Sequence, residues 1–173
     1  MITIICGTNR PDSNSAKVSE LYAKTLSERG EDCQILDLLE VDASWIQDSH
    51  FGDNVPEFEA VVTRFIHSAQ KLVFIVPEYN GGFPGYLKYF IDACEHGDWK
   101  DKKVALIGLA TGRGGNLRGV DHLTGILHYL GSEVYSRKVY LSQVNQLMTA
   151  EGQFVGNIVS DEIDAQIAGF VTF

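Results

Sequence analysis

The sequence has few of the residues that stabilise small proteins through covalent or metal links. Its three cysteines, Cys6, Cys33 and Cys94, are widely spaced and form no CxxC pair, so they indicate no disulfide framework. Cys6 and Cys94 lie in apolar stretches and are expected to be small core residues. The five histidines form no HExxH motif and no ligand-like cluster. We therefore expect no metal site and a fold stabilised by its hydrophobic core.

Long apolar runs and an excess of basic residues are also absent. No apolar run approaches the ~18 residues that span a bilayer, and the chain begins without the basic region or cleavage site of a signal peptide. The 14 Lys and Arg residues are outnumbered by 23 Asp and Glu, and the resulting net charge of −9 disfavours nucleic acid and anionic membranes as partners. We expect a cytoplasmic protein with no membrane and no nucleic-acid partner.

The sequence does contain a regular alternation of short apolar runs with helical patterns. Its 173 residues fit one domain, 1–173, and no linker or internal repeat divides them. The predicted strands are residues 2–6, 33–39, 72–76, 104–110 and 134–141. Most of these runs are continuously apolar, which is typical of parallel strands buried on both faces by helices.

Helix signals occupy the segments between these runs. Helices are predicted around residues 18–26, over 57–70 after Pro56, over 85–96 and 117–130, and from Ser160 onward, where Ser160 is the expected cap. Residues 145–157 are assigned only to a loop or small extension. The order βαβαβαβαβα predicts an α/β, flavodoxin-like three-layer sandwich: a five-stranded parallel sheet of order 2-1-3-4-5 with helices on both faces.

In such a sheet the ligand crevice is formed by the loops after strands 1, 3 and 4. The first of these loops carries two kinds of polar group suited to a phosphate, the side chains of Thr8, Arg10, Ser13, Asn14 and Ser15 and the free N–H groups of a helix N-terminus. The alternative is that Ser13 or Ser15 only caps the helix. The loop is neither a P-loop nor a GxGxxG fingerprint, which argues against nucleoside triphosphates and Rossmann-type dinucleotides.

The other two loops indicate a flat ligand. Residues 77–86 combine turn-forming glycines and prolines with Tyr79, Asn80 and Phe83, and their backbone could approach a planar ring closely. The alternative is a structural turn with Pro84 at a helix start. Residues 111–116 contain three glycines and Arg113, which indicates either a wall of the same crevice or a flexible connection.

Two of these stretches resemble motifs of the NADPH-dependent FMN reductase family, which includes small FMN-dependent quinone, azo and chromate reductases. Residues 7–13, GTNRPDS, resemble its GSxRxxS phosphate loop, and residues 77–92, PEYNGGFPGYLKYFID, resemble its PEYNGSxPGxLKNxID stretch. The second match is long and specific. Thr8 replaces a residue that is usually Ser in the family. Gly82 replaces a residue that is commonly Ser or Thr. Tyr89 and Phe90 replace a smaller polar pair, which enlarges the apolar surface of their helix.

The resemblance implies an FMN-dependent oxidoreductase that takes hydride from NADPH or NADH and passes it to a quinone, free flavin or similar small-molecule acceptor. It implies cofactor contacts from Thr8, Arg10, Ser13, Asn14, Ser15, Pro77, Glu78, Tyr79, Asn80, Gly81, Thr111, Gly112 and Gly115. It demands no side chain as a catalytic acid or base, and it implies a homodimer or homotetramer. The alternatives are a flavodoxin-like electron-transfer protein, which the acidic charge favours, and a binding or sensor protein.

Overall fold

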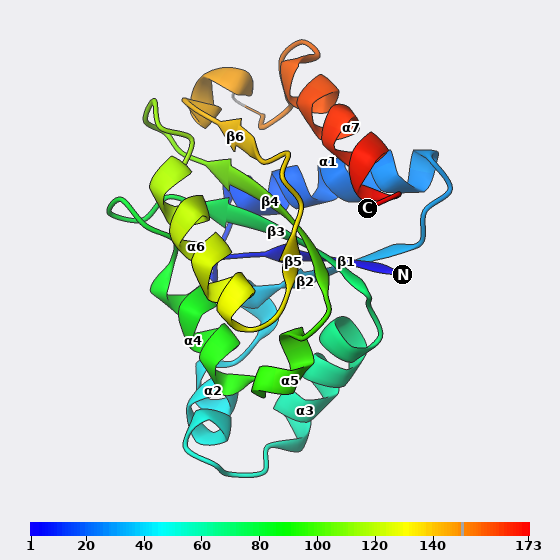
Figure 1. Ribbon diagram of the computed structural model, residues 1–173. Coiled ribbons are helices and arrows are strands. Elements are labelled where there is room, and N and C mark those ends of the chain that lie inside the picture. Colours follow the sequence, from blue (N-terminus) through cyan, green and yellow to red (C-terminus); the bar gives the residue numbers. More distant parts are fainter. Residues whose placement is uncertain (150) are drawn as a thin grey trace.

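The computed structural model describes residues 1–149 and 151–173, and its centre is a twisted parallel sheet (Figure 1). The strands are β1 (Ile2–Cys6), β2 (Cys33–Asp37), β3 (Lys71–Pro77), β4 (Lys103–Leu109), β5 (Glu133–Val134) and β6 (Val139–Leu141). Their order is β2-β1-β3-β4-β5, with β6 also paired to β4, and every pair is parallel. The predicted order 2-1-3-4-5 is confirmed.

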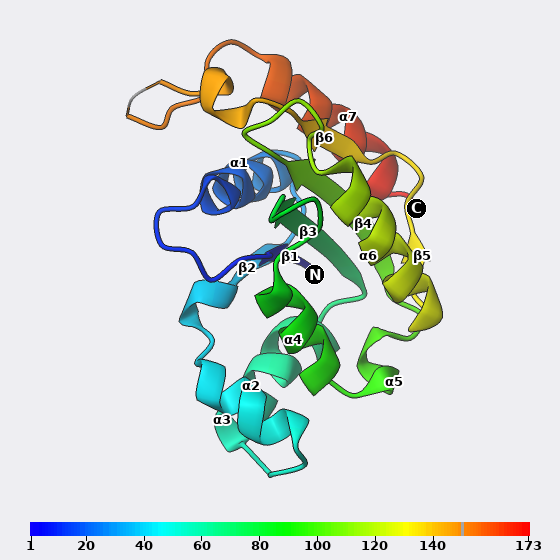
Figure 2. The same ribbon diagram turned by 90° about the vertical axis from the view of Figure 1, so that its left-hand side faces the viewer.

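Helices cover both faces of this sheet, as Figure 2 shows. On one face lie α1 (Asn14–Glu28) and α7 (Ile158–Phe170), and on the other lie α2 (Ala43–His50), α3 (Pro56–Val62), α4 (Gly85–Ala93), α5 (His96–Trp99) and α6 (Leu117–Tyr129). Successive residues of β3 alternate between the two cores: Val73 and Ile75 pack with α1 and α7, whereas Leu72 and Phe74 pack on the opposite side. All four side chains are fully buried, which explains the continuous apolar run.

Two predicted strands end or break earlier than expected. The strand predicted over 33–39 stops at Asp37, whose carboxylate accepts the N–H of Leu39 (3.0 Å) and begins the 3-10 turn η1 (Leu38–Glu40). The strand predicted over 134–141 is split into β5 and β6. The side-chain amide of buried Gln166 in α7 donates to Leu106 O (3.1 Å) and Arg137 O (2.8 Å), so it occupies the interruption in the ladder.

The helix predictions need four corrections. Helix α2 was not predicted, because Ile46 is its only buried residue and leaves almost no apolar periodicity. The helix predicted over 57–70 changes after α3 into a π-helical turn, η2 (Thr63–His67). The last helix begins at Ile158 with Asn157 as its cap, so the predicted cap at Ser160 is wrong. Ser160 lies inside the helix and its hydroxyl donates to Asn157 O (2.9 Å).

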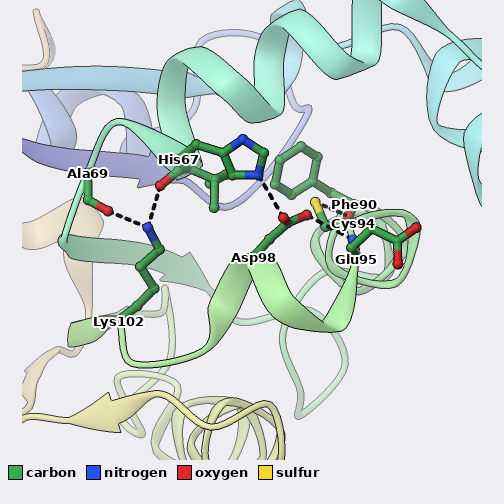
Figure 3. A network of polar contacts seen from close by, with 8 residues as sticks. His67, Ala69, Phe90, Cys94, Glu95, Asp98 and Lys102 are labelled. Atoms are coloured by element: carbon green, nitrogen blue, oxygen red, sulfur yellow. Dashed lines mark hydrogen bonds and ion pairs between the residues drawn. The ribbon is translucent and has the colours of Figure 1, made fainter.

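The helix predicted over 85–96 also breaks, because Glu95 and Asp98 form a capping box that starts α5 after α4 has ended. Figure 3 shows how this short helix is attached to η2. The Asp98 carboxylate lies 2.7 Å from His67 Nε2, and Lys102 Nζ donates to Ile66 O (2.8 Å) and Ala69 O (2.5 Å). These bonds satisfy carbonyls at the end of the π-helical segment.

The remaining expectations concern the cysteines, the membrane and residues 145–157. Cys6 is fully buried, whereas Cys94 is only half-buried. No helix in the described residues is long and apolar enough to cross a membrane. The segment before α7 contains the 3-10 turn η3 (Val144–Leu147) and a bridge between Met148 and Phe154. Residue 150 lies outside the description.

Candidate functional site

The loops that follow β1, β3 and β4 meet at a cleft of about 550 Å³ at the carboxyl edge of the sheet. The predicted site residues that line it are Thr8, Arg10, Ser13, Asn14, Ser15, Pro77, Glu78, Tyr79, Asn80 and Thr111. The predicted residues Gly81, Gly112 and Gly115 do not line it. Five further residues do, and these were not predicted: Asp12, Leu109, Ala110, Val144 and Asn145. Chain segments far apart in sequence thus share one cleft.

The first loop ends in a side-chain cap. Ser13 is the N-cap of α1, and its hydroxyl accepts the N–H of Ala16 (3.1 Å). The interpretation of Ser13 as a helix cap is therefore confirmed. Beneath the loop lies Cys6, where burial, reinforced by the nearby Asp37 carboxylate, raises the pKa of the thiol to about 12. This thiol is neutral at physiological pH and has a structural role.

Ser15 behaves differently from Ser13. Its hydroxyl is buried at the wall of the cleft and has no hydrogen-bond partner among the described residues. It lies in the first turn of a 15-residue helix that carries no acidic residue there. An unpaired buried hydroxyl costs free energy unless a ligand satisfies it, and the N-terminus of a long helix attracts anions. This end of the cleft is therefore suited to a phosphate group.

A hydrogen bond joins the first loop to the second. The Thr8 and Tyr79 hydroxyls lie 2.9 Å apart, and the Thr8 hydroxyl also accepts the N–H of Arg10 (3.3 Å). Thr8 is almost fully buried, whereas Tyr79 is half-exposed at the cleft. This hydrogen bond thus holds the first loop and the second loop at a defined separation across the cleft.

The second loop is a two-residue β-hairpin. Tyr79 and Gly82 exchange backbone hydrogen bonds (2.9 and 3.0 Å), and the residues between them, Asn80 and Gly81, have φ values of 52° and 80°. Positive φ at both central positions defines a type I′ turn, for which Asn-Gly is the preferred pair. The sequence interpretation as a structural turn is therefore also correct.

The turn decides which backbone groups of this loop can bind a ligand. The N–H of Glu78 is used by Leu109 O (2.8 Å), and those of Tyr79 and Gly82 are used within the hairpin. In the described chain only Asn80 and Gly81 of the hairpin have no backbone partner for their N–H groups. Gly81 could thus contribute its backbone although its atoms do not line the cleft in this structure.

The third loop is fixed by its neighbours. Gly112 O accepts the N–H of Gln143 (2.8 Å), and a Cβ on Gly115 would lie 2.9 Å from Cβ of Tyr140. Close packing against Tyr140 therefore restricts position 115, whereas Gly112 contributes its backbone carbonyl. The buried Asn116 donates through Nδ2 to Val76 O (3.0 Å), which ties the start of α6 to the end of β3. The interpretation of this loop as a flexible connection is not supported.

The missed lining residues differ in how readily they could have been found. Leu109 and Ala110 end a predicted strand immediately before a predicted ligand loop, so their position was implied. Val144 and Asn145 come from η3, whose sequence has no regular pattern. Asn145 Oδ1 accepts from Asn14 Nδ2 (3.0 Å) across 131 positions of the chain. Only the tertiary structure reveals that contact.

An open parallel sheet of this order, with a cleft formed by a helix N-terminus and two loops at its carboxyl edge, defines a flavodoxin-like α/β protein. Residues 1–146 match the family model described as NADPH-dependent FMN reductase, and the chain belongs to that family. It is therefore an enzyme of the FMN-dependent, NAD(P)H-using oxidoreductases, as the resemblance of its loops implied.

Individual relatives agree with this assignment. The chain is 24% identical to a 2-hydroxy-1,4-benzoquinone reductase of a Burkholderia species, over 98% of this chain and 91% of the relative. It is 29% identical to an NAD(P)H-dependent FMN reductase of Pseudomonas aeruginosa, over 64% and 63% of the two chains. Among solved structures, the flavoenzyme NAD(P)H:(acceptor) oxidoreductase FerB of Paracoccus denitrificans superposes with a TM-score of 0.82 at 23% identity, covering 99% and 94%. This structural likeness confirms the fold.

Proposed function

We propose that this enzyme binds FMN in the cleft and passes hydride from NADPH or NADH through it to a small-molecule acceptor, a quinone in the first instance. The observation that carries the proposal is the buried hydroxyl of Ser15, which lines the cleft at the start of α1 and has no hydrogen-bond partner among the described residues. A cleft of about 550 Å³ lies within the range of cofactor sites, roughly 300–1,000 Å³. The Burkholderia relative, a reductase of 2-hydroxy-1,4-benzoquinone, supports a quinone as acceptor.

The residues present fit the two parts of FMN. We assign the phosphate to a phosphate end, formed by Thr8, Arg10, Ser13, Asn14 and Ser15. We assign the isoalloxazine to a ring end, formed by Pro77, Glu78, Tyr79, Asn80, Gly81 and Thr111. Gly112 and Gly115 support the ring end by keeping the third loop close to Gln143 and Tyr140. FMN supplies the redox chemistry when bound, by accepting hydride and delivering two electrons.

The protein's own contribution is binding and electrostatics. At the ring end, the N–H groups of Asn80 and Gly81 lack backbone partners in the described chain and can donate to a ring edge that gains negative charge. At the phosphate end, the Ser15 hydroxyl and the helix N-terminus hold the anion. We assign no side chain as a catalytic acid or base.

We also propose a cytoplasmic homodimer or homotetramer, as the family resemblance implies. A half-open apolar groove of about 440 Å³ lies between α4 and α6, with Ile91 and Ile126 in its lining. Tyr129, also in that lining, is 81% exposed, which suits a surface covered by a second copy. Gel filtration with and without FMN tests this, and a purely monomeric profile would contradict it.

The function is tested by flavin absorbance of the purified protein and by steady-state oxidation of NADPH and NADH with a panel of quinones and free flavins. We expect yellow protein or FMN binding on addition, and quinone-dependent oxidation of at least one nicotinamide. Oxidation of NADPH and NADH that stays at the background rate with every acceptor would contradict the proposed enzymatic function. In that case two well-separated one-electron potentials in a redox titration would favour a flavodoxin-like carrier.

A further inference from the structure

A fourth segment of the chain contributes two residues, Val144 and Asn145, to the lining of the cleft beside the first and third loops. The N–H of Gln143 donates to Gly112 O (2.8 Å), and that of Val144 donates to Ala110 O (2.9 Å). The Val144 side chain is buried in the core with α1 and α7. The backbone of Gln143 and Val144 is therefore hydrogen-bonded to the residues that follow β4. Asn145 comes directly after these two bonded residues.

That next residue, Asn145, reaches the first turn of α1. Its Oδ1 accepts a hydrogen bond from Nδ2 of Asn14 (3.0 Å), and both residues line the cleft. Asn14 is the first residue of α1, between the cap Ser13 and the unpaired hydroxyl of Ser15. One N–H of the Asn14 amide is used by Asn145, and within the described part of the chain nothing accepts the other, which can therefore donate to a ligand.

We propose that Asn145 is a positioning residue for the phosphate end, acting through Asn14 on the cofactor phosphate. The side-chain oxygen of Asn145 accepts from Asn14, so its effect is to hold the half-buried Asn14 amide in one orientation at the helix N-terminus. Without it, Asn14 must be ordered when the ligand binds, at a cost in side-chain entropy. This inference rests on the proposed function, since it requires a phosphate-bearing flavin in the cleft.

Apo-protein titrated with FMN and with riboflavin, followed by flavin fluorescence, separates the two ends of the cleft. We expect Asn145→Ala to raise the Kd for FMN by roughly fivefold, the effect of one lost hydrogen bond, and to leave the Kd for riboflavin unchanged. Gln146→Ala is the matched control, because Gln146 is the next residue of η3, is exposed and makes no side-chain hydrogen bond in the described structure. Its affinities should equal those of the wild type.

Two further variants test the route through Asn14. Asn14→Ala combined with Asn145→Ala should bind FMN no more weakly than Asn14→Ala alone, because the two residues act as one unit. Asn145→Asp keeps an acceptor for Asn14 but places a carboxylate near the phosphate. Its FMN affinity should fall most at low ionic strength and recover with added salt, whereas its riboflavin affinity should not depend on salt.

The outcomes distinguish a failure of the proposed function from a failure of the positioning role. Wild-type protein that binds no FMN would overturn the proposed function together with this inference. If the wild type binds FMN but Asn145→Ala binds it equally well, or loses FMN and riboflavin to the same extent, only the positioning role is overturned. Thermal unfolding of each apo-variant shows whether it is folded as the wild type is.

Discussion

The two ends of the cleft are built from different kinds of structure. The phosphate end depends on a helix N-terminus and on side-chain hydroxyls, of which one caps the helix and another is left unpaired in a buried position. The ring end depends on the backbone of a type I′ hairpin and on close packing of that hairpin against α6. A substitution at the phosphate end should therefore change cofactor affinity by the contribution of a single hydroxyl. A substitution beneath the ring end should instead displace the whole hairpin.

The largest expected effect comes from Gly119→Ala beneath the ring end. A Cβ on Gly119 would lie 2.7 Å from the backbone C of Gly82 and 2.8 Å from Phe83 N, so the hairpin must move. We expect the free energy of unfolding to fall by about 1–3 kcal/mol and the affinities for FMN and riboflavin to fall together. Urea denaturation and flavin titration measure both effects.

Gly125→Ala, in the same helix, is the matched control for that variant. Nothing lies within 4 Å of the position of its added Cβ. We expect it to stabilise the protein by about 0.5–1 kcal/mol, because alanine is the better helix former, without changing flavin affinity. If the two alanine variants have equal unfolding free energies and flavin affinities, the hairpin is not closely packed against α6.

The next largest effect separates two serines of the phosphate end. Ser15→Ala should weaken FMN binding by roughly tenfold or more, through loss of a hydrogen bond to a charged group, while leaving the apo-protein as stable as the wild type or more so. Ser13→Ala should lower the free energy of unfolding of the apo-protein by about 1 kcal/mol, because it removes the cap of α1. Ser15→Ala protein that is itself destabilised by this amount would argue against an unpaired hydroxyl.

The third prediction concerns pH and the thiol beneath the phosphate end. Burial raises the pKa of Cys6 from 9.0 to about 12, so between these values the unfolded chain releases a proton that the folded chain retains. The stabilisation is complete below pH 9 and is lost progressively as the pH rises toward 12. One such group accounts for a loss of about 1.4 kcal/mol by pH 10. Urea denaturation at pH 8 and pH 10 should show a smaller pH-dependent loss in Cys6→Ala than in the wild type.

The smallest expected effect is that of Gly81→Ala in the hairpin. No atom lies within 4 Å of the added Cβ, so only the positive φ of 80° opposes the substitution. We expect a loss of about 1 kcal/mol in the free energy of unfolding, the cost of placing an L-residue in the left-handed region. Thermal unfolding measures it, and Gly85→Ala, which has equally open surroundings but no positive φ, is the comparison. A loss as large as that of Gly119→Ala would mean that the hairpin is constrained by more than its turn.

The sequence by itself determined the strand order and most of the loop residues that line the cleft. Apolar runs such as 72–76 indicate strands covered on both faces, and Asn80-Gly81 and the Ser13 cap are local signals whose geometry depends on a few adjacent residues. These features were predictable because the physical cause of each lies within a short stretch of chain.

Only the tertiary structure decided the features that depend on distant partners. The break between β5 and β6 is matched by Gln166, which comes from a later helix, and α2 buries too little surface to leave a pattern. The contrast between Ser13 and Ser15 depends on their hydrogen-bond partners: the Ser13 hydroxyl accepts the N–H of Ala16, whereas the Ser15 hydroxyl has no partner among the described residues. Asn145 meets Asn14 across 131 residues. No local propensity encodes such contacts, because they arise when the packed sheet brings remote segments together.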